Sequence, residues 1–300
     1  MGKPRGFMEY ERRDPGYRPK EERVRDFRAV ELRLSEEEVR EQAARCMDCG
    51  IPFCHGCGCP VFNAIPEIND HIYHGRWKEA LDILLIANRF PEFTARICPA
   101  LCEGSCVLGL DREPVAIRQI EMAVVEKGFE MGYIQPMPPR TRQPGKVAVI
   151  GSGPAGLAVA DMVNRAGYSV TVFDAEARPG GILRYGIPEF KLEKWILDRR
   201  IRLMEQEGIV FETAVRVGDD ISSRYLQNRF QAACLCVGAR APRDLKVPGR
   251  DLQGVYFAMD YLVQQNRSLA GESIPAGTAI SAQGRQVLII GGGDTGADCV

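Results

Sequence analysis

Cysteine spacing is the feature that most constrains how this chain folds. Eight of its eleven cysteines lie between positions 46 and 106, and five of them fall within the stretch CMDCGIPFCHGCGCP at 46–60. A chain of 300 residues that is 45% hydrophobic can bury a core without cross-links, so it does not need a disulfide scaffold. Clustered thiols in such a chain indicate metal binding, and the loops that carry them have to fold around the metal.

The spacing favours iron–sulfur ligation over zinc. The pattern is C-x2-C-x4-C-x2-C-x-C-P at 46–60, followed by C-P-x2-C-x3-C at 98–106. A structural zinc site needs four ligands, usually two separated CxxC pairs, whereas seven or eight thiols are available here. A Cys-Pro ending recurs in iron–sulfur proteins, where the last cysteine often serves the other cluster of a pair. Two [4Fe–4S] clusters are therefore expected, with structural zinc as the alternative.

Composition excludes several classes of partner. The formal net charge is −1, so the chain as a whole shows no attraction to nucleic acid or to an acidic membrane. No apolar run is long enough to cross a bilayer, and the charged N-terminus has no secretory signal. We expect a cytoplasmic protein with two or three domains.

The first part of the chain is expected to be helical. Residues 1–34 are charged and contain prolines, which fits either a solvated tail or an arm that lies on the chain or on a partner. Ser35 and Glu38 form a capping box at the start of a helix that leads to Cys46. Apolar residues at helical spacing predict two further helices, at 76–88 and 115–132, before a proline-rich linker at 136–145.

A glycine turn at 151–156 predicts a nucleotide-binding fold. The sequence KVAVIGSGPAGLAVA places Gly151, Gly153 and Gly156 between a predicted strand (146–150) and a predicted helix. These glycines allow a tight turn, close approach of a pyrophosphate, and close packing of helix on strand. Asp174 ends the next strand, 23 residues after Gly151, where a carboxylate is expected to bind a ribose hydroxyl.

A second strand–turn–helix pattern begins at 286, with Gly291, Gly293 and Gly296 in the turn. Two such folds in one chain indicate two nucleotides that exchange a hydride, a flavin and a nicotinamide. The loop at 178–192 carries Gly180 and Gly181, which would let it lie against a flat cofactor. The apolar strand at 231–239 ends in Gly238 near bound nucleotide, and its Cys234 and Cys236 are interpreted as small buried side chains.

Two kinds of side chain near the cysteines are ambiguous. Glu121 shares a helix face with apolar residues, and its spacing alone favours a position at the edge of that face with the carboxylate in water. His55, His71 and His74 are interpreted as packing or surface residues rather than ligands.

The motifs GFMEYERRDPGYRP, EEEVREQAARCMDCGIPFCH, PEFTARICPALCEGSCVLG, GSGPAGLAVA, GGILRYGIPEFKL and GGGDTGADCV together resemble the small (β) subunits of NADPH-dependent glutamate synthases. The cysteine and nucleotide motifs are shared with a wider family that includes the N-terminal half of dihydropyrimidine dehydrogenase. The resemblance implies an α/β chain in which a helical iron–sulfur domain precedes a Rossmann-like FAD-binding domain and the start of a second Rossmann-like, NAD(P)H-binding domain. The implied boundaries are an arm at 1–34, the iron–sulfur domain at 35–143, the FAD domain at 144–283 and the NAD(P)H domain from 284 to 300.

The same resemblance implies a function. Such a subunit passes hydride from NADPH to FAD and then electrons through two [4Fe–4S] clusters to FMN in a large (α) subunit, which makes L-glutamate from L-glutamine and 2-oxoglutarate. An alternative is a related reductase with another acceptor, such as ferredoxin or a pyrimidine-reducing domain. The choice between NADPH and NADH depends on residues beyond position 300.

The resemblance also implies site residues. One cluster would be held by Cys46, Cys49, Cys54 and Cys106, and the other by Cys59, Cys98, Cys102 and Glu121. Cys57 is the alternative to Cys59, which the following proline favours. FAD would contact Gly151, Gly153, Pro154, Ala155, Gly156, Asp174, Gly180, Gly181, Arg184 and Gly238, and the nicotinamide nucleotide would contact Gly291, Gly293, Asp294, Thr295 and Gly296. Because the sequence stops inside the second turn's helix, we expect a fragment that binds NADPH poorly on its own.

Overall fold

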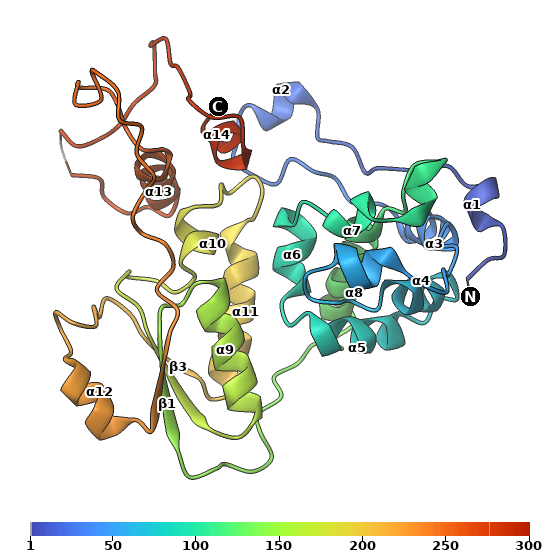
Figure 1. Cartoon of the computed structure of the whole chain (residues 1–300), viewed down its shortest axis with the longest axis horizontal. Helices are drawn as coiled ribbons and strands as arrows, with labels where there is room; N and C mark the ends of the chain where they lie inside the picture. Colours follow the sequence, from blue (N-terminus) through green and yellow to red (C-terminus); the bar gives the residue numbers. More distant parts are fainter. Residues whose placement is uncertain (1, 276) are drawn as a thin grey trace. The chain divides into compact units, whose positions relative to one another are not determined.

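The computed structural model describes residues 2–275 and 277–300, which form two compact units. One unit comprises the chain up to Gln135 together with Phe190–Leu192, and the other comprises Pro136–Glu189 and Glu193–Val300 (Figure 1). The first is helical and the second is built on a parallel sheet. The segment predicted as a linker, 136–145, has no helix or strand.

Short helices connected by loops make up the helical unit. The helices predicted at 76–88 and 115–132 are present as α5 and α8, each slightly shorter than expected. The elements of this unit are α1 (Gly6–Glu9), α2 (Lys20–Arg23), α3 (Glu36–Ala44), the π-helix η1 (Cys54–Gly58), α4 (Ile65–Tyr73), α5 (Trp77–Ala87), α6 (Pro91–Ile97), α7 (Leu101–Gly104), the 3₁₀-helix η2 (Val107–Leu110) and α8 (Ile117–Glu130).

Helix α3 begins at the predicted capping box. The Ser35 hydroxyl accepts a hydrogen bond from the Glu38 backbone N–H at 3.3 Å, and the Glu38 carboxylate accepts one from the Ser35 N–H at 2.7 Å. These two bonds satisfy N–H groups that the first turn of a helix leaves unpaired. The helix ends at Ala44, two residues before Cys46, the first of the clustered cysteines.

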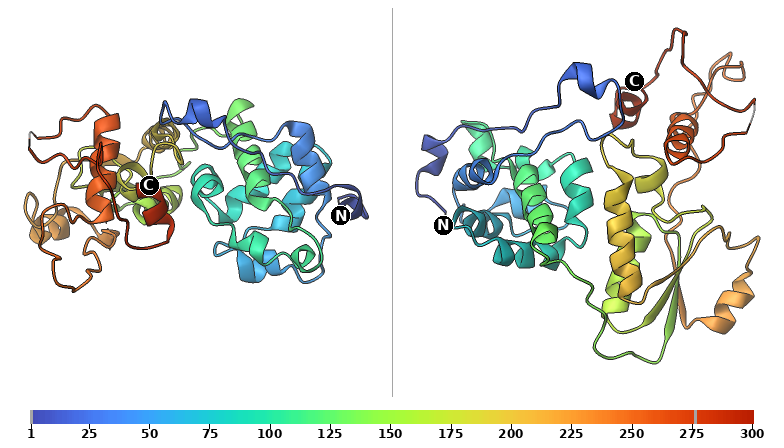
Figure 2. Two further views of the ribbon diagram at one scale, coloured as in Figure 1. Left: turned by 90° about the horizontal axis from the view of Figure 1, so that it is seen from above. Right: turned by 180° about the vertical axis from the view of Figure 1, so that it is seen from behind.

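Helix α8 lies in the middle of the helical unit, in contact with α3, α4, α5 and α6 (Figures 1 and 2). Its apolar face packs against the residues of the other helices that make up the core, among them Val39, Ile68 and Leu81. Cys59 and Cys102 belong to the same buried cluster. The thiols are thus part of the hydrophobic core rather than attached to its surface.

The N-terminal segment is an arm that lies on the helical unit, which excludes a free tail. Arg45, which is fully buried, donates hydrogen bonds to the backbone carbonyls of Tyr10, Glu113 and Pro114. Further along the arm, Glu31 forms an ion pair with Arg118 of α8 at 2.5 Å. The arm is therefore held near Tyr10 by Arg45, the residue before Cys46, and near Glu31 by Arg118 of the helix that carries Glu121.

The α/β unit contains a four-stranded parallel sheet in the order β3-β2-β1-β4. The predicted strand, turn and helix at 146–165 are present, and the next strand ends at the residue before Asp174, as expected. The elements are β1 (Lys146–Ile150), α9 (Pro154–Arg165), β2 (Ser169–Phe173), α10 (Ile182–Tyr185), α11 (Lys194–Gln206), β3 (Val210–Glu212), α12 (Ser223–Arg229), β4 (Ala232–Leu235), α13 (Ala258–Leu269) and α14 (Asp294–Cys299).

Alternation along β1 gives the sheet two covered faces. Ala148 and Ile150 pack with Leu226 of α12, whereas Val149 faces the turn into α9. Figure 1 shows α9 and α11 on one side of the sheet and α12 on the other. The carboxyl end of β1 and the start of α9 thus meet at one edge of the sheet, which is where parallel α/β sheets bind ligands.

Two expectations in the α/β unit are wrong. Residues 286–290 were expected to form a strand, but no strand in the described part of the chain pairs with them, and Leu288 is 85% exposed. A strand forms only where a neighbour satisfies its backbone groups. Cys234 and Cys236 are half-buried rather than buried, because β4 is the outermost strand of the sheet.

None of the described helices is long and apolar enough to cross a membrane.

Candidate functional site

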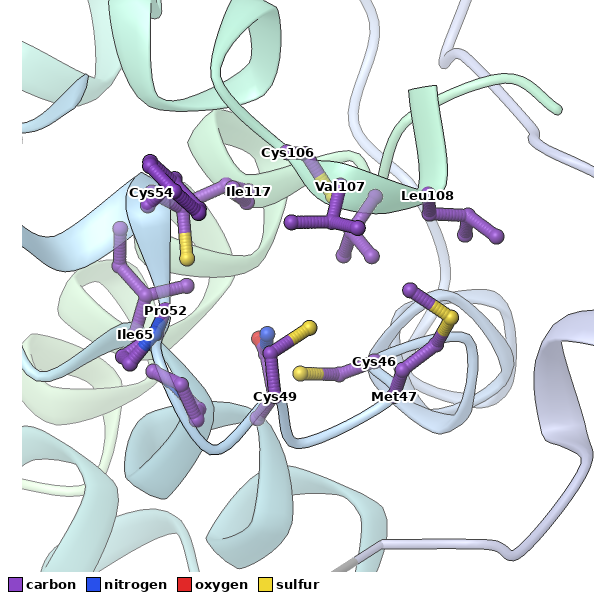
Figure 3. Close-up of a pocket in the computed structure, with 14 residues that line it drawn as sticks. Cys46, Met47, Cys49, Pro52, Cys54, Ile65, Cys106, Val107, Leu108 and Ile117 are labelled. Carbon is purple, nitrogen blue, oxygen red and sulfur yellow. The ribbon is translucent and has the colours of Figure 1, made fainter. Parts of the chain in front are cut away.

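Four of the eight clustered cysteines line one pocket of the helical unit. Cys46 and Cys49 follow α3, Cys54 begins η1, and Cys106 precedes η2. In Figure 3 the sulfur atoms of Cys46, Cys49 and Cys54 point toward the space between these loops. The rest of the lining is almost entirely apolar: Met47, Pro52, Phe53, Ile65, Pro66, Val107, Leu108, Val115 and Ile117, with Asn69 as the polar exception. We call these four cysteines the first thiol group.

Burial raises the pKa of Cys46, Cys49 and Cys54 in the first thiol group. Removal from water, together with the nearby Cys46 and Cys106, raises the pKa of Cys54 to about 12. Burial also raises the pKa of Cys46, although hydrogen bonds from the Asn69 side chain and the Asp48 backbone oppose that shift. Four thiolates in an apolar pocket would repel one another, so only a strongly positive centre stabilises them together. This donor set fits an iron–sulfur cluster.

A second group surrounds Cys102 on α7. Burial raises the pKa of the Cys102 thiol, and the negative charges of Glu121, Glu103, Cys59 and Cys98 raise it further. Cys59 and Cys102 are both buried. Cys98 ends α6, and Glu121 projects from α8. The fold thus brings Cys59, Cys98, Cys102 and Glu121 close together, and we call them the second thiol group.

Glu121 is a buried carboxylate. The position predicted from spacing alone, at the edge of the helix face with the carboxylate in water, is wrong because only 8% of Glu121 is exposed. Burial raises its pKa to about 7, while a hydrogen bond from the Asn63 side chain, 2.7 Å from Oε1, lowers it. A carboxylate buried beside thiols needs a cation or hydrogen bonds to be stable, which suits a ligand.

Cys57 lies apart from both groups. It is exposed, whereas Cys59 is buried and accepts a hydrogen bond from the Asn63 backbone N–H at 3.4 Å. Gly58 between them allows the loop to approach α7, because a Cβ at that position would lie 2.7 Å from the Cα of Cys102. The geometry favours Cys59 as the member of the second group.

All three histidines have hydrogen-bonding partners within the protein. Nδ1 of His55 lies 2.7 Å from the carbonyl of Asn63, His71 accepts from Arg76, and Nδ1 of His74 lies near the carbonyl of Asp70. Within residues 2–275 and 277–300, no three His, Cys, Asp or Glu side chains converge on a position for a single metal ion.

The first glycine turn has the geometry that its sequence predicts. Gly151 has a φ of 103°, which favours glycine, and a Cβ there would lie 2.3 Å from the Cys236 carbonyl oxygen. A Cβ on Gly156 would lie 1.9 Å from the carbonyl oxygen of Gly151. A Cβ on Gly153 would meet nothing within 4 Å, so space remains in front of Pro154 and Ala155, the exposed first residues of α9. That space fits a phosphate at a helix N-terminus.

Asp174 has a structural role that its position in the sequence did not predict. Its carboxylate accepts hydrogen bonds from the Ser152 N–H at 2.7 Å, from the Ser152 hydroxyl, and from the Glu176 N–H at 2.9 Å. The Ser152 hydroxyl in turn accepts from the N–H of Gly180. Ser152 therefore ties the turn to the 178–192 loop. This role of Ser152 was not predicted, because it depends on contacts with residues more than 20 positions away.

The 178–192 loop meets the glycine turn at Gly181. A Cβ there would lie 2.7 Å from the Cα of Gly153, and φ at Gly181 is 50°. Arg184 is buried and holds the loop through Pro179 and Asp198. Its Nη1 has no hydrogen-bonding partner among the described residues. A buried guanidinium nitrogen without a partner, close to this turn, fits a polar or anionic cofactor.

The remaining predicted nucleotide residues lie at the end of β4 and around the second glycine turn. Gly238 follows β4 with a φ of 68° and open space around its Cα. Gly291 has a φ of 118°, and a Cβ on Gly296 would lie 2.5 Å from the Gly291 carbonyl oxygen, which repeats the packing of the first turn. Asp294 and Thr295 begin α14, and Gly293 precedes it.

Both units match described families. Residues 23–133 match the family "Dihydropyrimidine dehydrogenase domain II, 4Fe-4S cluster", which includes all the members of both thiol groups. Residues 145–300 match "Pyridine nucleotide-disulphide oxidoreductase", which includes both glycine turns. The first match favours iron–sulfur over zinc in the helical unit.

Among curated proteins, the chain is similar along its whole length to two bacterial proteins named "Glutamate synthase [NADPH] small chain". It is 52% identical to that of Bacillus subtilis (strain 168) and 51% identical to that of Mycobacterium tuberculosis (strain H37Rv). The chain spans 62% of the length of each. It is also 49% identical to "Glutamate synthase [NADH]" of Schizosaccharomyces pombe, of which it covers 14%.

Proposed function

Because the chain belongs to the pyridine nucleotide-disulphide oxidoreductase family and resembles glutamate synthase small chains over its whole length, we propose that it is the electron-input subunit of a glutamate synthase. In this role hydride passes from NADPH to FAD, and electrons continue through two [4Fe–4S] clusters to FMN in a large subunit that forms L-glutamate from L-glutamine and 2-oxoglutarate. The chain covers only part of these relatives, so the activity is proposed for the whole protein.

The observation that carries this proposal is the pocket with four cysteines and an apolar lining. Its donor chemistry suits an iron–sulfur cluster, and the second thiol group provides a further set of four ligands. We propose that Cys46, Cys49, Cys54 and Cys106 hold one cluster, and that Cys59, Cys98, Cys102 and Glu121 hold the other. Raised thiol pKa values mean that binding of each cluster releases protons.

The glycine turn at 151–156 would hold the pyrophosphate of FAD. Gly153 leaves room for the phosphates, and the N–H groups of the first turn of α9 would donate to them. Asp174 keeps Ser152 and the 178–192 loop in place, and Arg184 would supply its remaining donor. Gly180, Gly181 and Gly238 complete the proposed contacts. FAD, when bound, would accept two electrons and release them singly.

For the nicotinamide nucleotide we propose contacts from Gly291, Gly293, Asp294, Thr295 and Gly296. NADPH is the proposed donor, as the names of the bacterial relatives suggest, although the Schizosaccharomyces pombe relative is named for NADH. We further propose four segments, an arm (1–34), an iron–sulfur domain (35–143), an FAD domain (144–283) and a nicotinamide domain from 284, in a cytoplasmic protein. Neither nucleic acid nor a membrane is a proposed partner.

One observation supports a second candidate. The family that matches 23–133 is named for dihydropyrimidine dehydrogenase, so the same machinery could deliver electrons to a different acceptor. The 51–52% identity to glutamate synthase small chains favours the first proposal.

The proposal is tested on the complete protein, purified without oxygen. Iron, zinc, acid-labile sulfide and flavin would be measured, and NADPH-dependent glutamate formation would be assayed with and without a glutamate synthase large subunit. We expect iron and sulfide in equal amounts, bound FAD, and glutamate formation only with the large subunit. Zinc without sulfide would refute the cluster assignment. Full reductase activity that never supports glutamate formation would favour the second candidate.

A further inference from the structure

We propose that Asn63 is a positioning residue that holds Glu121 in the second thiol group and thereby sets the reduction potential of the cluster bound there. This inference rests on the proposed function, because it requires Glu121 to be a ligand.

Asn63 contacts two members of the second thiol group at once. Its side-chain Nδ2 donates to Glu121 Oε1 at 2.7 Å, and its backbone N–H donates to Cys59 Sγ at 3.4 Å. Only 2% of Asn63 is exposed, so water does not compete for these contacts. One residue therefore joins the loop that carries Cys59 to the helix that carries Glu121.

The loop around Asn63 is built to hold it in place. The Asn63 carbonyl lies 2.7 Å from Nδ1 of His55, which follows Cys54 of the first thiol group. Phe62 has a left-handed φ of 57° although it is a bulky residue, and it is 59% exposed. Such a conformation is unfavourable for a bulky residue and persists only where the surroundings require it. Phe62 gains little burial itself, so the benefit of its conformation lies with the residue that follows.

The amide has a defined chemical effect on a ligand. A hydrogen bond donated to a ligating carboxylate withdraws electron density from it, and N–H donors to ligating sulfur act in the same direction. Both make a cluster easier to reduce. The Asn63 side chain is thus expected to raise the potential of the cluster held by Glu121, and its loss should leave the cluster in the first thiol group unaffected.

The decisive experiment replaces Asn63 with leucine, which has a similar size but no donor. Asn63→Leu and wild-type holoprotein would be titrated with reductant under EPR, together with Asn69→Leu as the matched control. Asn69 is also a buried asparagine, but it lines the pocket of the first thiol group. We expect Asn63→Leu to keep its iron, to shift one cluster to a more negative potential and to change that cluster's signal. Asn69→Leu should leave that cluster as in wild type. An unchanged potential and signal in Asn63→Leu would overturn the proposal.

Two further variants keep the result interpretable. If Asn63→Leu loses the second cluster, Asn63→Gln, which retains an amide donor, should recover at least part of it. Equal loss in both variants would show that the shape of Asn63 matters and not its hydrogen bond. Glu121→Ala tests the ligand itself. If Glu121→Ala removes the cluster while Asn63→Leu changes nothing, only the inference about Asn63 fails. If Glu121→Ala keeps all iron and both signals, the ligand assignment in the proposed function fails as well.

Discussion

The thiol groups of the helical unit and the glycine turn of the α/β unit are built in opposite ways. Each thiol group gathers side chains from distant segments of the chain, such as Cys54 and Cys106 or Cys59 and Cys98, and burial raises the pKa of Cys54 and of Cys102. The glycine turn uses six consecutive residues, and its shape comes from the backbone. A thiol group needs a bound positive centre to stabilise its thiolates, whereas the glycine turn has its shape before any cofactor binds. Substitutions should therefore affect cofactor content in one unit and folding in the other.

The largest effect is expected from Cys59→Ser. If the thiol groups are ligand sets, this variant should lose one cluster, which is about half of the iron and sulfide. Cys57→Ser is the matched control, because Cys57 is exposed and lies two residues away, and it should retain all of both. Anaerobic iron and sulfide analysis measures the difference. Loss in Cys57→Ser and retention in Cys59→Ser would reverse the assignment.

Gly156→Ala tests whether the turn depends on the backbone. The added Cβ would lie 1.9 Å from the Gly151 carbonyl oxygen, so α9 has to move away from β1, and we expect a loss of about 3 kcal/mol in unfolding free energy. Gly153→Ala has open space around its Cβ and should change stability by less than about 0.5 kcal/mol while lowering FAD content. Urea unfolding and flavin absorbance measure both. Equal stabilities of the two variants would contradict this picture.

The α/β unit also contains an ionisable side chain whose pKa is shifted by burial, Lys194, so this property is not confined to the helical unit. Burial lowers its pKa to about 8, against the nearby Glu189. Between pH 8 and the unfolded value of 10.5 the unfolded chain binds more protons, so this group makes stability rise with pH, by up to about 1.4 kcal/mol per unit. Below pH 8 the full destabilisation from burying the charged Lys194 side chain is present. Lys194→Met should show a smaller rise in unfolding free energy from pH 8 to pH 10 than wild type, and an equal rise would contradict the assignment.

The smallest effect is expected at the capping box. Ser35→Ala removes the hydroxyl that accepts the Glu38 N–H, which should lower unfolding free energy by about 1 kcal/mol. Iron content should stay at the wild-type level, because α3 only precedes Cys46. Loss of iron in this variant would show that local backbone structure, and not the ligands, governs the thiol groups.

Features determined by local sequence were predictable. The capping box fixes the start of α3, and the glycine spacing fixes the turn between β1 and α9, because both depend on neighbouring residues. The division of the cysteines between two groups was predicted by resemblance alone, and the fold brings the members of each group together.

Contacts between distant segments were not predictable. Nothing near Glu121 in the sequence indicates that Asn63, 58 positions earlier, donates to its carboxylate. The arm at 1–34 has the composition of a solvated tail, yet Arg45 and Arg118 hold it. Residues 286–290 have the apolar pattern of a strand but form none, because no neighbouring strand among the described residues pairs with them.

The interlaced order of the two thiol groups has a consequence for biosynthesis. Cys46, Cys49 and Cys54 leave the ribosome early, but the proposed fourth ligand of their cluster is Cys106. Cys59 is likewise made well before its proposed partners Cys98, Cys102 and Glu121. The arm, made first of all, cannot settle until Arg118 has emerged. If the two groups are ligand sets, the first is complete only when Cys106 has been made and the second only when Glu121 has been made, so the second cluster could be inserted only after translation has passed position 121. Until then the thiols of the nascent chain have no cluster to bind and have to stay reduced.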